Sequence, residues 1–334
     1  MSSPSTLRDL GTAQAALGTA ETALGGRLLG RESDVVPAGS ARRSVAEALV
    51  EALVDLGVEY AFGIFGGGIG PFCRALHESP IRLLHYRHEA GAAFAAIEAS
   101  LASERLVVVA VTTGPGLTNL YTGMAAARWE GARVLFVSGY TSAERRGRFA
   151  FQETSPAAPG LLGAFQAGSL FHHAAVIEHP EELAVALAQV RRALAQPGGF
   201  VGHLGIALPQ QTAPAPDALR TPELEIEAPR VSVAGSARVA ELLAREPFVI
   251  WAGFGARHAG RELRALAEAA GAPVMCSPRA KGCFPEQHPL YLGVTGLGGH
   301  SRVLEHFVKT APERVLVLGT KLGEMTSFWS EAFV

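Results

Sequence analysis

Short apolar runs alternate along most of this chain with longer segments in which apolar positions recur every three or four residues. In the first two thirds, the short runs predict strands at 60–64, 82–86, 106–111, 133–138 and 199–207. The longer segments predict helices at 44–56, 71–78, 88–102, 119–129 and 180–195, whereas residues 142–175 are less regular. Strands that alternate with helices over short connections indicate an α/β fold with a mostly parallel sheet wrapped by helices.

The same alternation resumes after a proline-rich stretch. The prolines of that stretch are Pro209, Pro214, Pro216, Pro222 and Pro229. Low periodicity and frequent proline predict a semi-rigid linker over residues 209–232. Beyond it, helices are predicted at 237–245, 260–270 and 301–310, and strands at 248–252, 273–277 and 314–318. The expected organisation is therefore two Rossmann-like domains, at 41–208 and 233–334.

Residues 1–40 form a separate N-terminal extension with a seven-residue repeat. The segment 11–17 reads GTAQAAL and the segment 18–24 reads GTAETAL. A leucine stripe at this spacing favours a helix that docks on a partner, but each glycine weakens a helix by about 1 kcal/mol relative to alanine. A flexible tail and a partner-docking helix both remain open.

Composition narrows the range of partners. The chain has 334 residues, 48% of them hydrophobic and 18% charged, which is enough apolar sequence to bury a large core. A formal charge of −2 without a dense Lys/Arg run gives no electrostatic footprint for nucleic acid or an anionic membrane. No apolar run is long enough for a transmembrane helix, and the first residues lack the basic and apolar pattern of a secretion signal. We therefore expect a cytoplasmic location. The three cysteines lack metal-binding spacing, so we expect free thiols.

Two motifs about one βα unit apart carry the candidate chemistry. Glu89 follows His88 at the start of a predicted helix, where the helix dipole alone favours a carboxylate by about 0.3 to 1 kcal/mol. The second motif is Thr113-Gly114-Pro115-Gly116, with Asn119 opening the next helix. Taken alone it is an ordinary turn between a strand and a helix. Their order resembles the pyrimidine-binding domain of thiamine-diphosphate enzymes, in particular those similar to acetohydroxyacid synthase.

This resemblance implies a role for Glu89 in activating the cofactor. In the family, a glutamate at this helix start hydrogen-bonds N1′ of the aminopyrimidine and promotes the imino tautomer that takes the proton from C2 of the thiazolium. The resemblance also implies a set of cofactor-binding residues besides Glu89: Gly66, Gly67, Thr113, Gly114, Pro115, Gly116 and Asn119. The loop that contains Gly66 and Gly67 resembles a Phe-Gly-x-Pro-Gly loop, with Phe65 where proline is common.

One later segment bears on the substrate. Phe151-Gln152-Glu153-Thr154 resembles a Phe-Gln-Glu segment that reaches towards the substrate in acetohydroxyacid synthases. The resemblance implies that Phe151 and Gln152 lie on the substrate side, with Gln152 as a second catalytic candidate. The adjacent His172 and His173 are expected to form a surface or interface pair.

The region 252–319 resembles the central domain of the same family, in which some members bind FAD. The candidate nucleotide contacts are Gly253, Gly255, Gly296, Leu297 and Gly298. A NAD site is disfavoured because the next strand ends in Ser277-Pro278-Arg279 without an acidic residue for the ribose. FAD remains possible, although Lys321-Leu322-Gly323-Glu324 departs from the run typical of FAD-bearing synthases.

A complete enzyme of this family has a third domain, in which a Gly-Asp-Gly segment and a downstream Asn hold Mg²⁺ and the diphosphate. None of the four aspartates here, Asp9, Asp34, Asp55 and Asp217, lies between glycines. The resemblance thus covers residues 42–334, stops before the last strand of the central domain, and implies no metal site in this chain. Thiamine diphosphate and Mg²⁺ would be anchored mainly by a partner subunit, in a heterotetramer or larger assembly.

The function implied is one subunit of a split 2-oxo acid carboligase, which decarboxylates pyruvate or a similar acid and transfers the acyl unit to an acceptor carbonyl. A subunit of a 2-oxo acid decarboxylase, a carbon-carbon lyase, is a close alternative. A non-catalytic regulatory or scaffolding homologue remains open as well. A nicotinamide- or flavin-dependent oxidoreductase explains nothing about the first domain.

Overall fold

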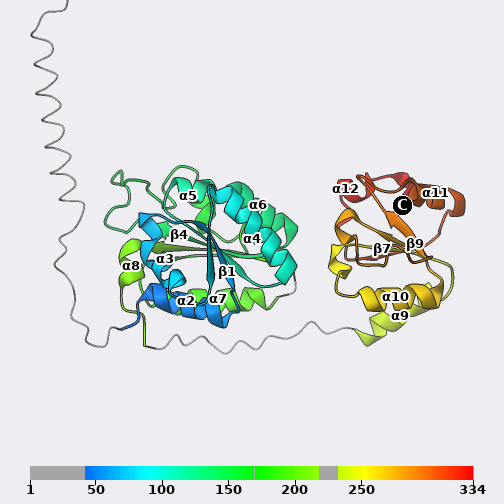
Figure 1. The fold of residues 1–334 in the computed structure, drawn as a ribbon, viewed down its shortest axis with the longest axis horizontal. Coiled ribbons are helices and arrows are strands. Elements are labelled where there is room, and N and C mark those ends of the chain that lie inside the picture. Colours follow the sequence, from blue (N-terminus) through cyan, green and yellow to red (C-terminus); the bar gives the residue numbers. More distant parts are fainter. Residues whose placement is uncertain (1–41, 169, 197, 218–231, 334) are drawn as a thin grey trace, which may run out of the picture. The chain divides into compact units, whose positions relative to one another are not determined.

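The computed structural model describes residues 42–168, 170–196, 198–217 and 232–333 (Figure 1). These residues fall into two compact units, one that contains 42–217 and one that contains 232–333. The predicted extension at 1–40 lies outside the described residues. No described helix combines the length and the apolar character that crossing a bilayer requires.

The first unit is built on six parallel strands in the order β2-β1-β3-β4-β6-β5. The strands are β1 (Tyr60–Ile64), β2 (Arg82–His85), β3 (Val107–Val111), β4 (Arg133–Tyr140), β5 (His173–Ile177) and β6 (Phe200–Ala207). The predicted parallel α/β fold is confirmed. Because β1 pairs with β2 on one side and β3 on the other, the loops that follow β1 and β3 flank a topological switch point. Ligands of parallel α/β sheets bind at this edge.

Helices cover both faces of the six-stranded sheet (Figure 1). The helices are α2 (Val45–Asp55), α3 (Gly70–His77), α4 (Glu89–Ser103), α5 (Pro115–Thr118), α6 (Tyr121–Glu130), α7 (Glu182–Leu194) and α8 (Leu208–Thr212). Two 3-10 helices, η1 (Gly67–Ile69) and η2 (Leu162–Phe165), complete the unit. Every residue of β3 is buried, and alternate side chains pack into the α2, α3 and α7 core or into the α4 and α6 core. Burial on both faces explains the uninterrupted apolar run of this strand.

The structure corrects three expectations for the first unit. Asn119 caps the end of the one-turn helix α5 and does not open α6, which begins at Tyr121. β5 was not predicted, because its pattern HAAVI begins with a histidine and two short alanines and leaves only two large apolar residues. His173 is buried in that strand, so the two adjacent histidines do not form a surface pair.

The start of the proline-rich stretch also belongs to the first unit. Residues 208–212 form α8, and the backbone N–H of Ala215 donates to the carbonyl of Arg43 at 2.7 Å. Ser44 forms an isolated antiparallel bridge with Pro214. Backbone pairing of this kind fixes the segment through residue 215, and the remainder of the expected linker, 218–231, lies outside the described residues.

The second unit has four parallel strands in the order β10-β7-β8-β9. The strands are β7 (Val249–Ala252), β8 (Val274–Cys276), β9 (Tyr291–Val294) and β10 (Val315–Leu318). Its helices are α9 (Val233–Leu243), α10 (Gly260–Ala270), α11 (Ser301–Thr310) and α12 (Glu324–Ser327), with 3-10 helices η3 (Phe254–Ala256), η4 (Pro278–Ala280) and η5 (Glu331–Phe333). One core cluster centres on Ile250 and Phe284, and another on Trp251 and Phe307. The second predicted parallel sheet is therefore present.

Candidate functional site

Glu89 lies at the start of α4, one short loop after β2. His88 is the N-cap residue, and its Nδ1 atom accepts the backbone N–H of Ala90 at 3.2 Å. The cap fixes the direction in which α4 begins, and the carboxylate of Glu89 lies in the first turn with only 8% of the residue exposed. The helix dipole favours a negative charge at this place.

The turn after β3 meets Glu89 from the neighbouring element. The Nδ2 atom of Asn119 donates to Oε2 of Glu89 at 3.0 Å. Gly116 lies against the other carboxylate oxygen, since a Cβ at that position would be 3.6 Å from Oε1 and 3.1 Å from the Cγ2 atom of Thr112. The structure thus brings together three residues that the sequence singled out, and it orients the carboxylate with an amide donor.

Gly114 opens this turn with a backbone conformation that requires glycine, φ 60° and ψ −116°. Its N–H donates to the hydroxyl of the buried Thr154 at 2.6 Å. A Cβ on Gly114 would lie 2.7 Å from Cβ of Gln152. Thr154 is held in turn by Thr141, whose hydroxyl accepts the Thr154 N–H at 2.8 Å. The predicted Gly-Pro-Gly turn and the predicted Phe-Gln-Glu segment therefore pack directly on each other.

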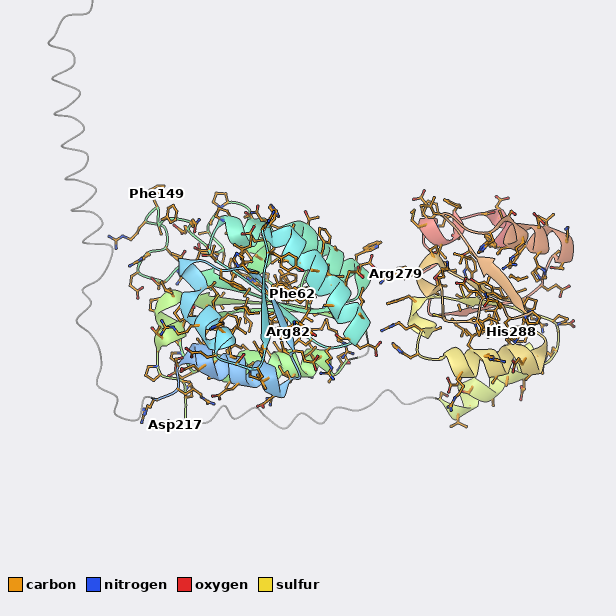
Figure 2. The ribbon with its side chains drawn as sticks, viewed as in Figure 1. Phe62, Arg82, Phe149, Asp217, Arg279 and His288 are labelled. Atoms are coloured by element: carbon orange, nitrogen blue, oxygen red, sulfur yellow. The ribbon has the colours of Figure 1, made fainter. Side chains whose placement is uncertain are left out.

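Gln152 extends this contact towards the predicted cofactor side. The hydroxyl of Thr113 donates to Oε1 of Gln152 at 3.2 Å, and Gln152 has a left-handed backbone with φ 53°. Phe151 is 91% exposed, and Phe149 is fully exposed and protrudes from the same loop (Figure 2). Gln152 therefore joins the site, whereas Phe151 faces solvent in this chain.

The glycine loop after β1 also lies at this edge. A Cβ on Gly66 would lie 3.0 Å from the side chain of Thr112, and one on Gly68 would lie 2.9 Å from that of Thr113. A Cβ on Gly67 would meet no heavy atom within 4 Å, so this glycine borders open space. Close approach of this loop to the Thr112 and Thr113 side chains accounts for Gly66 and Gly68, whereas no such contact accounts for Gly67.

Gln211 in α8 was not identified from the sequence, although it supports this loop. It is fully buried; its Nε2 donates to the carbonyl of Gly68 at 2.9 Å, and its Oε1 accepts the N–H of Phe72 at 3.3 Å. A single glutamine in a proline-rich stretch carries no local signal of this role, because both partners lie far away in the sequence.

A buried Ser138–His203 pair is a second feature that sequence reasoning missed. Ser138 Oγ lies 2.9 Å from Nε2 of His203, and Nδ1 of His203 lies 2.5 Å from the carbonyl oxygen of Ala164. Burial lowers the pKa of His203 to about 4, so the ring is neutral at physiological pH. A neutral ring that donates from Nδ1 accepts the serine hydroxyl at Nε2. The pair ties η2 to β4 and β6.

The arrangement around Glu89 fits the aminopyrimidine half of the cofactor that the sequence suggested. A buried carboxylate, oriented by an amide and flanked by a glycine, can accept or hold a proton at a ring nitrogen of a ligand. The loops at the switch point supply backbone close to the same carboxylate. Among the described residues, no group of three or more His, Cys, Asp or Glu side chains could hold a metal ion.

In the second unit, the predicted nucleotide glycines serve contacts within the protein. A Cβ on Gly253 would lie 2.4 Å from the carbonyl oxygen of Gly319, and one on Gly255 would lie 2.9 Å from the Cα of Gly319. A Cβ on Gly296 would lie 2.0 Å from the carbonyl oxygen of Met325, which accepts the N–H of Leu297 at 3.0 Å. Gly298 has φ 69° and open space around it. Backbone packing accounts for most of these glycines, and FAD binding remains a prediction.

Fold and site together define a parallel α/β domain with a candidate ligand site at its switch point, and a second parallel α/β domain follows it in the chain. Residues 43–158 match the N-terminal TPP-binding domain of thiamine pyrophosphate enzymes, and residues 236–333 match the central domain of the same enzymes. Thiamine pyrophosphate is thiamine diphosphate under another name. The chain therefore belongs to the thiamine pyrophosphate enzyme family, as the motifs around Glu89 and Gly114 predicted.

Curated relatives agree on one branch of this family. The chain is 32% identical over 301 residues to a probable acetolactate synthase large subunit of Methanocaldococcus jannaschii, covering 84% of this chain and 47% of the relative. It is 31% identical over 258 residues to the acetolactate synthase isozyme 2 large subunit of Escherichia coli, covering 76% and 45%. The identity to the acetolactate synthase isozyme 1 large subunit of Escherichia coli is 30% over 294 residues, which cover 86% of this chain and 50% of that relative. The chain spans about half the length of these relatives.

Proposed function

We propose that this chain supplies the pyrimidine-side half of a thiamine-diphosphate-dependent 2-oxo acid carboligase similar to acetolactate synthase. The observation that carries the proposal is the carboxylate of Glu89, buried at the start of α4, hydrogen-bonded to Asn119 and flanked by Gly116. When bound, the cofactor supplies a carbon nucleophile that takes the acyl unit of a 2-oxo acid such as pyruvate, with release of CO₂, and passes it to an acceptor carbonyl.

Each residue of the chain receives a role from its contacts. Glu89 holds a proton at N1′ of the pyrimidine, and Asn119 keeps the carboxylate in one orientation through the 3.0 Å hydrogen bond to Oε2. The backbone at Gly66, Gly67 and 113–116 borders the pyrimidine. Gln152 lies beside Thr113 and contributes to the acceptor side, with Phe151 covering it from solvent once the complex has formed.

We assign the Mg²⁺ and diphosphate contacts to a second subunit that carries a Gly-Asp-Gly segment and a downstream Asn. The match of residues 43–158 and 236–333 to the N-terminal and central domains of the family supports the assignment, because the proposed contacts of these residues are to the pyrimidine side. We propose that the two kinds of subunit form a heterotetramer or a larger assembly.

Replacement of Glu89 by Gln tests the proposal in the complex that this chain forms in its native cells. Pyruvate consumption by the purified complex is the readout, and calorimetric titration with thiamine diphosphate measures cofactor binding. The E89Q complex should assemble normally and lose at least about 100-fold in kcat, because the amide cannot take up the proton. Glu98→Gln is the matched control, since Glu98 lies on the same helix α4 and is exposed.

The products of the wild-type complex separate the two catalytic alternatives. A carboligase converts pyruvate into a larger 2-hydroxy-3-oxo acid, whereas a decarboxylase releases an aldehyde. If E89Q consumed pyruvate as fast as wild type, the catalytic role of this chain would be refuted and the non-catalytic regulatory homologue would take its place.

A further inference from the structure

The loop that carries Phe151 and Gln152 runs over residues 142–155, after β4, and we call it the Phe-Gln loop. The side chain of Arg146, in this loop, hydrogen-bonds to residues at the ends of two strands of the sheet. The NH2 group of Arg146 donates to Oε1 of Glu178 at 2.6 Å, and the NH1 group donates to the hydroxyl of Tyr140 at 3.0 Å. The guanidinium also lies 5.4 Å from the centre of the Tyr140 ring. One arginine thus joins the loop to the ends of two strands, β4 and β5.

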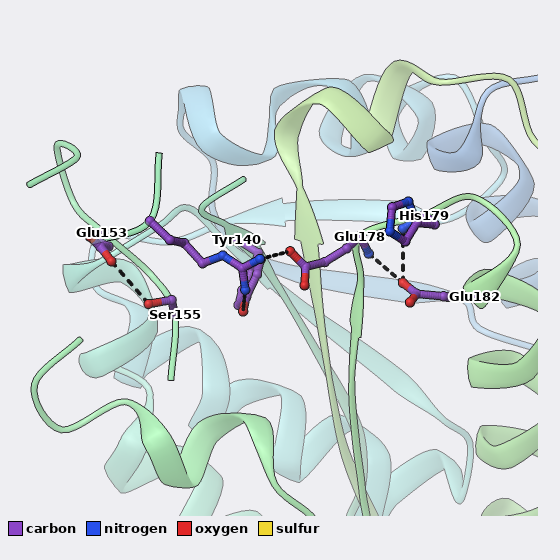
Figure 3. A network of polar contacts seen from close by, with 7 residues as sticks. Tyr140, Glu153, Ser155, Glu178, His179 and Glu182 are labelled. Atoms are coloured by element: carbon purple, nitrogen blue, oxygen red, sulfur yellow. Dashed lines mark hydrogen bonds and ion pairs between the residues drawn. The ribbon is translucent and has the colours of Figure 1, made fainter. Parts of the chain in front are cut away.

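Glu178 is itself fixed in place. It follows β5 directly, and its backbone N–H and that of His179 donate to Oε2 of Glu182 at 2.7 and 3.0 Å (Figure 3). Glu182 is the first residue of α7. The acceptor for Arg146 therefore belongs to a strand-to-helix connection that its own hydrogen bonds hold in place.

A second set of bonds links Arg146 to Gln152 through their neighbours in the chain. The N–H of Gly147 and the hydroxyl of Ser155 both donate to Oε1 of Glu153, at 2.9 and 3.3 Å. The residue after Arg146 is thus bonded to the residue after Gln152. Displacement of the arginine would be transmitted to Gln152, whose backbone already has the left-handed φ of 53° that only surrounding contacts maintain.

The partial burial of the ion pair makes it effective. The Arg146 and Glu178 side chains are 30% and 29% exposed, so solvent screens them less than a surface pair. The planar guanidinium also directs two N–H groups at two different acceptors, Glu178 and Tyr140, in a fixed geometry that a lysine ammonium does not provide. A partly buried arginine with two hydrogen-bond acceptors therefore restricts the positions that the Phe-Gln loop can adopt.

We propose that Arg146 and Glu178 act as a positioning pair that fixes the Phe-Gln loop, and thereby Gln152, beside Thr113 and Gly114. The consequence for acceptor binding rests on the proposed function. The constraint on the loop itself does not, because it follows from the contacts of this chain alone.

Glu178→Gln tests the constraint, with Glu181→Gln as a control that makes the same charge change at an exposed position nearby. The loop contains Arg145, Arg146 and Arg148, so the rate of tryptic cleavage between 145 and 148, followed by mass spectrometry, reports how often the loop opens. E178Q should be cut about five- to tenfold faster than wild type, and E181Q at the wild-type rate. The charge-swapped double variant R146E/E178R should restore protection at Arg145 and Arg148.

In the active complex, the same variants separate positioning from general stability. E178Q should raise the KM for the acceptor severalfold while kcat for pyruvate decarboxylation remains unchanged, and the charge swap should recover part of the loss. Equal cleavage rates in E178Q and wild type would overturn the proposal, as would faster cleavage at every site along the chain. If the loop opens in E178Q but E89Q retains turnover, the positioning pair stands and the proposed function fails.

Discussion

At the residue scale, His203 shows how burial alone can set a charge state. Its ring is fully buried between Phe165 and Phe171, at centroid distances of 5.2 and 5.5 Å. Burial is the main cause that lowers the pKa of His203 from 6.5 to about 4. The ring bonds to the hydroxyl of Ser138 and the carbonyl of Ala164, and neither group would neutralise the buried positive charge that protonation creates.

This lowered pKa predicts that the first unit loses stability in acid. The folded-state pKa lies below the unfolded one, so the contribution is fully present above pH 6.5 and is lost as the pH falls towards 4. The loss in free energy of unfolding should approach about 3 kcal/mol. Urea unfolding followed by circular dichroism at several pH values measures it.

His203→Gln is the reference for that measurement because glutamine does not titrate. The stability advantage of wild type over H203Q should shrink as the pH falls from 7.5 to 4.5. An advantage that stays constant over this range would show that the ring is protonated in the folded state without cost.

At the scale of elements, the site depends on connections that cross the sheet edge. α8 touches the loop after β1 through one buried side chain, Gln211, which bonds to Gly68, Phe72 and the carbonyl of Ile206. Because β6 and β1 are not neighbours in the sheet, this glutamine couples elements that no strand pairing joins.

Replacement of Gln211 by Leu should lower the free energy of unfolding by about 2 to 3 kcal/mol, since leucine leaves the Gly68 carbonyl and the Phe72 N–H buried without their partner. Gln210→Leu, one residue earlier and only partly buried, should change stability by about 0.5 kcal/mol or less. Urea titration of both variants makes the comparison. Equal effects would mean that leucine packing compensates for the lost hydrogen bonds.

At the scale of the whole molecule, the reactivity of the cysteines measures how well each of the two units buries its thiols. The three cysteines are free thiols, as predicted: Cys73 in the first unit, Cys276 and Cys283 in the second. Burial raises the pKa of Cys73 and of Cys276 to about 12, and it also raises the pKa of Cys283. Only the thiolate attacks a disulfide reagent, so buried thiols react slowly.

We expect the native chain to react slowly with Ellman's reagent at pH 8, with Cys283 first, and all three thiols to react rapidly in urea. Cys283→Ser should remove the fastest native phase and leave the other two. Rapid labelling of Cys276 in the folded chain, detected by mass spectrometry, would contradict the burial that the structure assigns to it.

Much of this protein could be predicted from its sequence. Both parallel sheets, most helices and the Glu89 and Gly114 motifs follow from patterns that are local along the chain: apolar periodicity, helix caps and glycine turns. Buried strands such as β3 are apolar throughout, which makes them easy to recognise. The strand β5 escaped prediction because it begins with a histidine and two alanines, so Val176 and Ile177 alone are too short an apolar run, and its pairing with β6 defines it.

Tertiary structure alone decided which of these motifs meet. The hydrogen bond from Asn119 to Glu89, the contact of Gln152 with Gly114 and the reach of Arg146 to Glu178 each join residues at least thirty positions apart. No local pattern encodes such contacts, because they depend on the order of strands in the sheet and on where each loop leaves it. The sequence by itself determined the elements and the chemistry available; the strand order β2-β1-β3-β4-β6-β5 determined that they form one site.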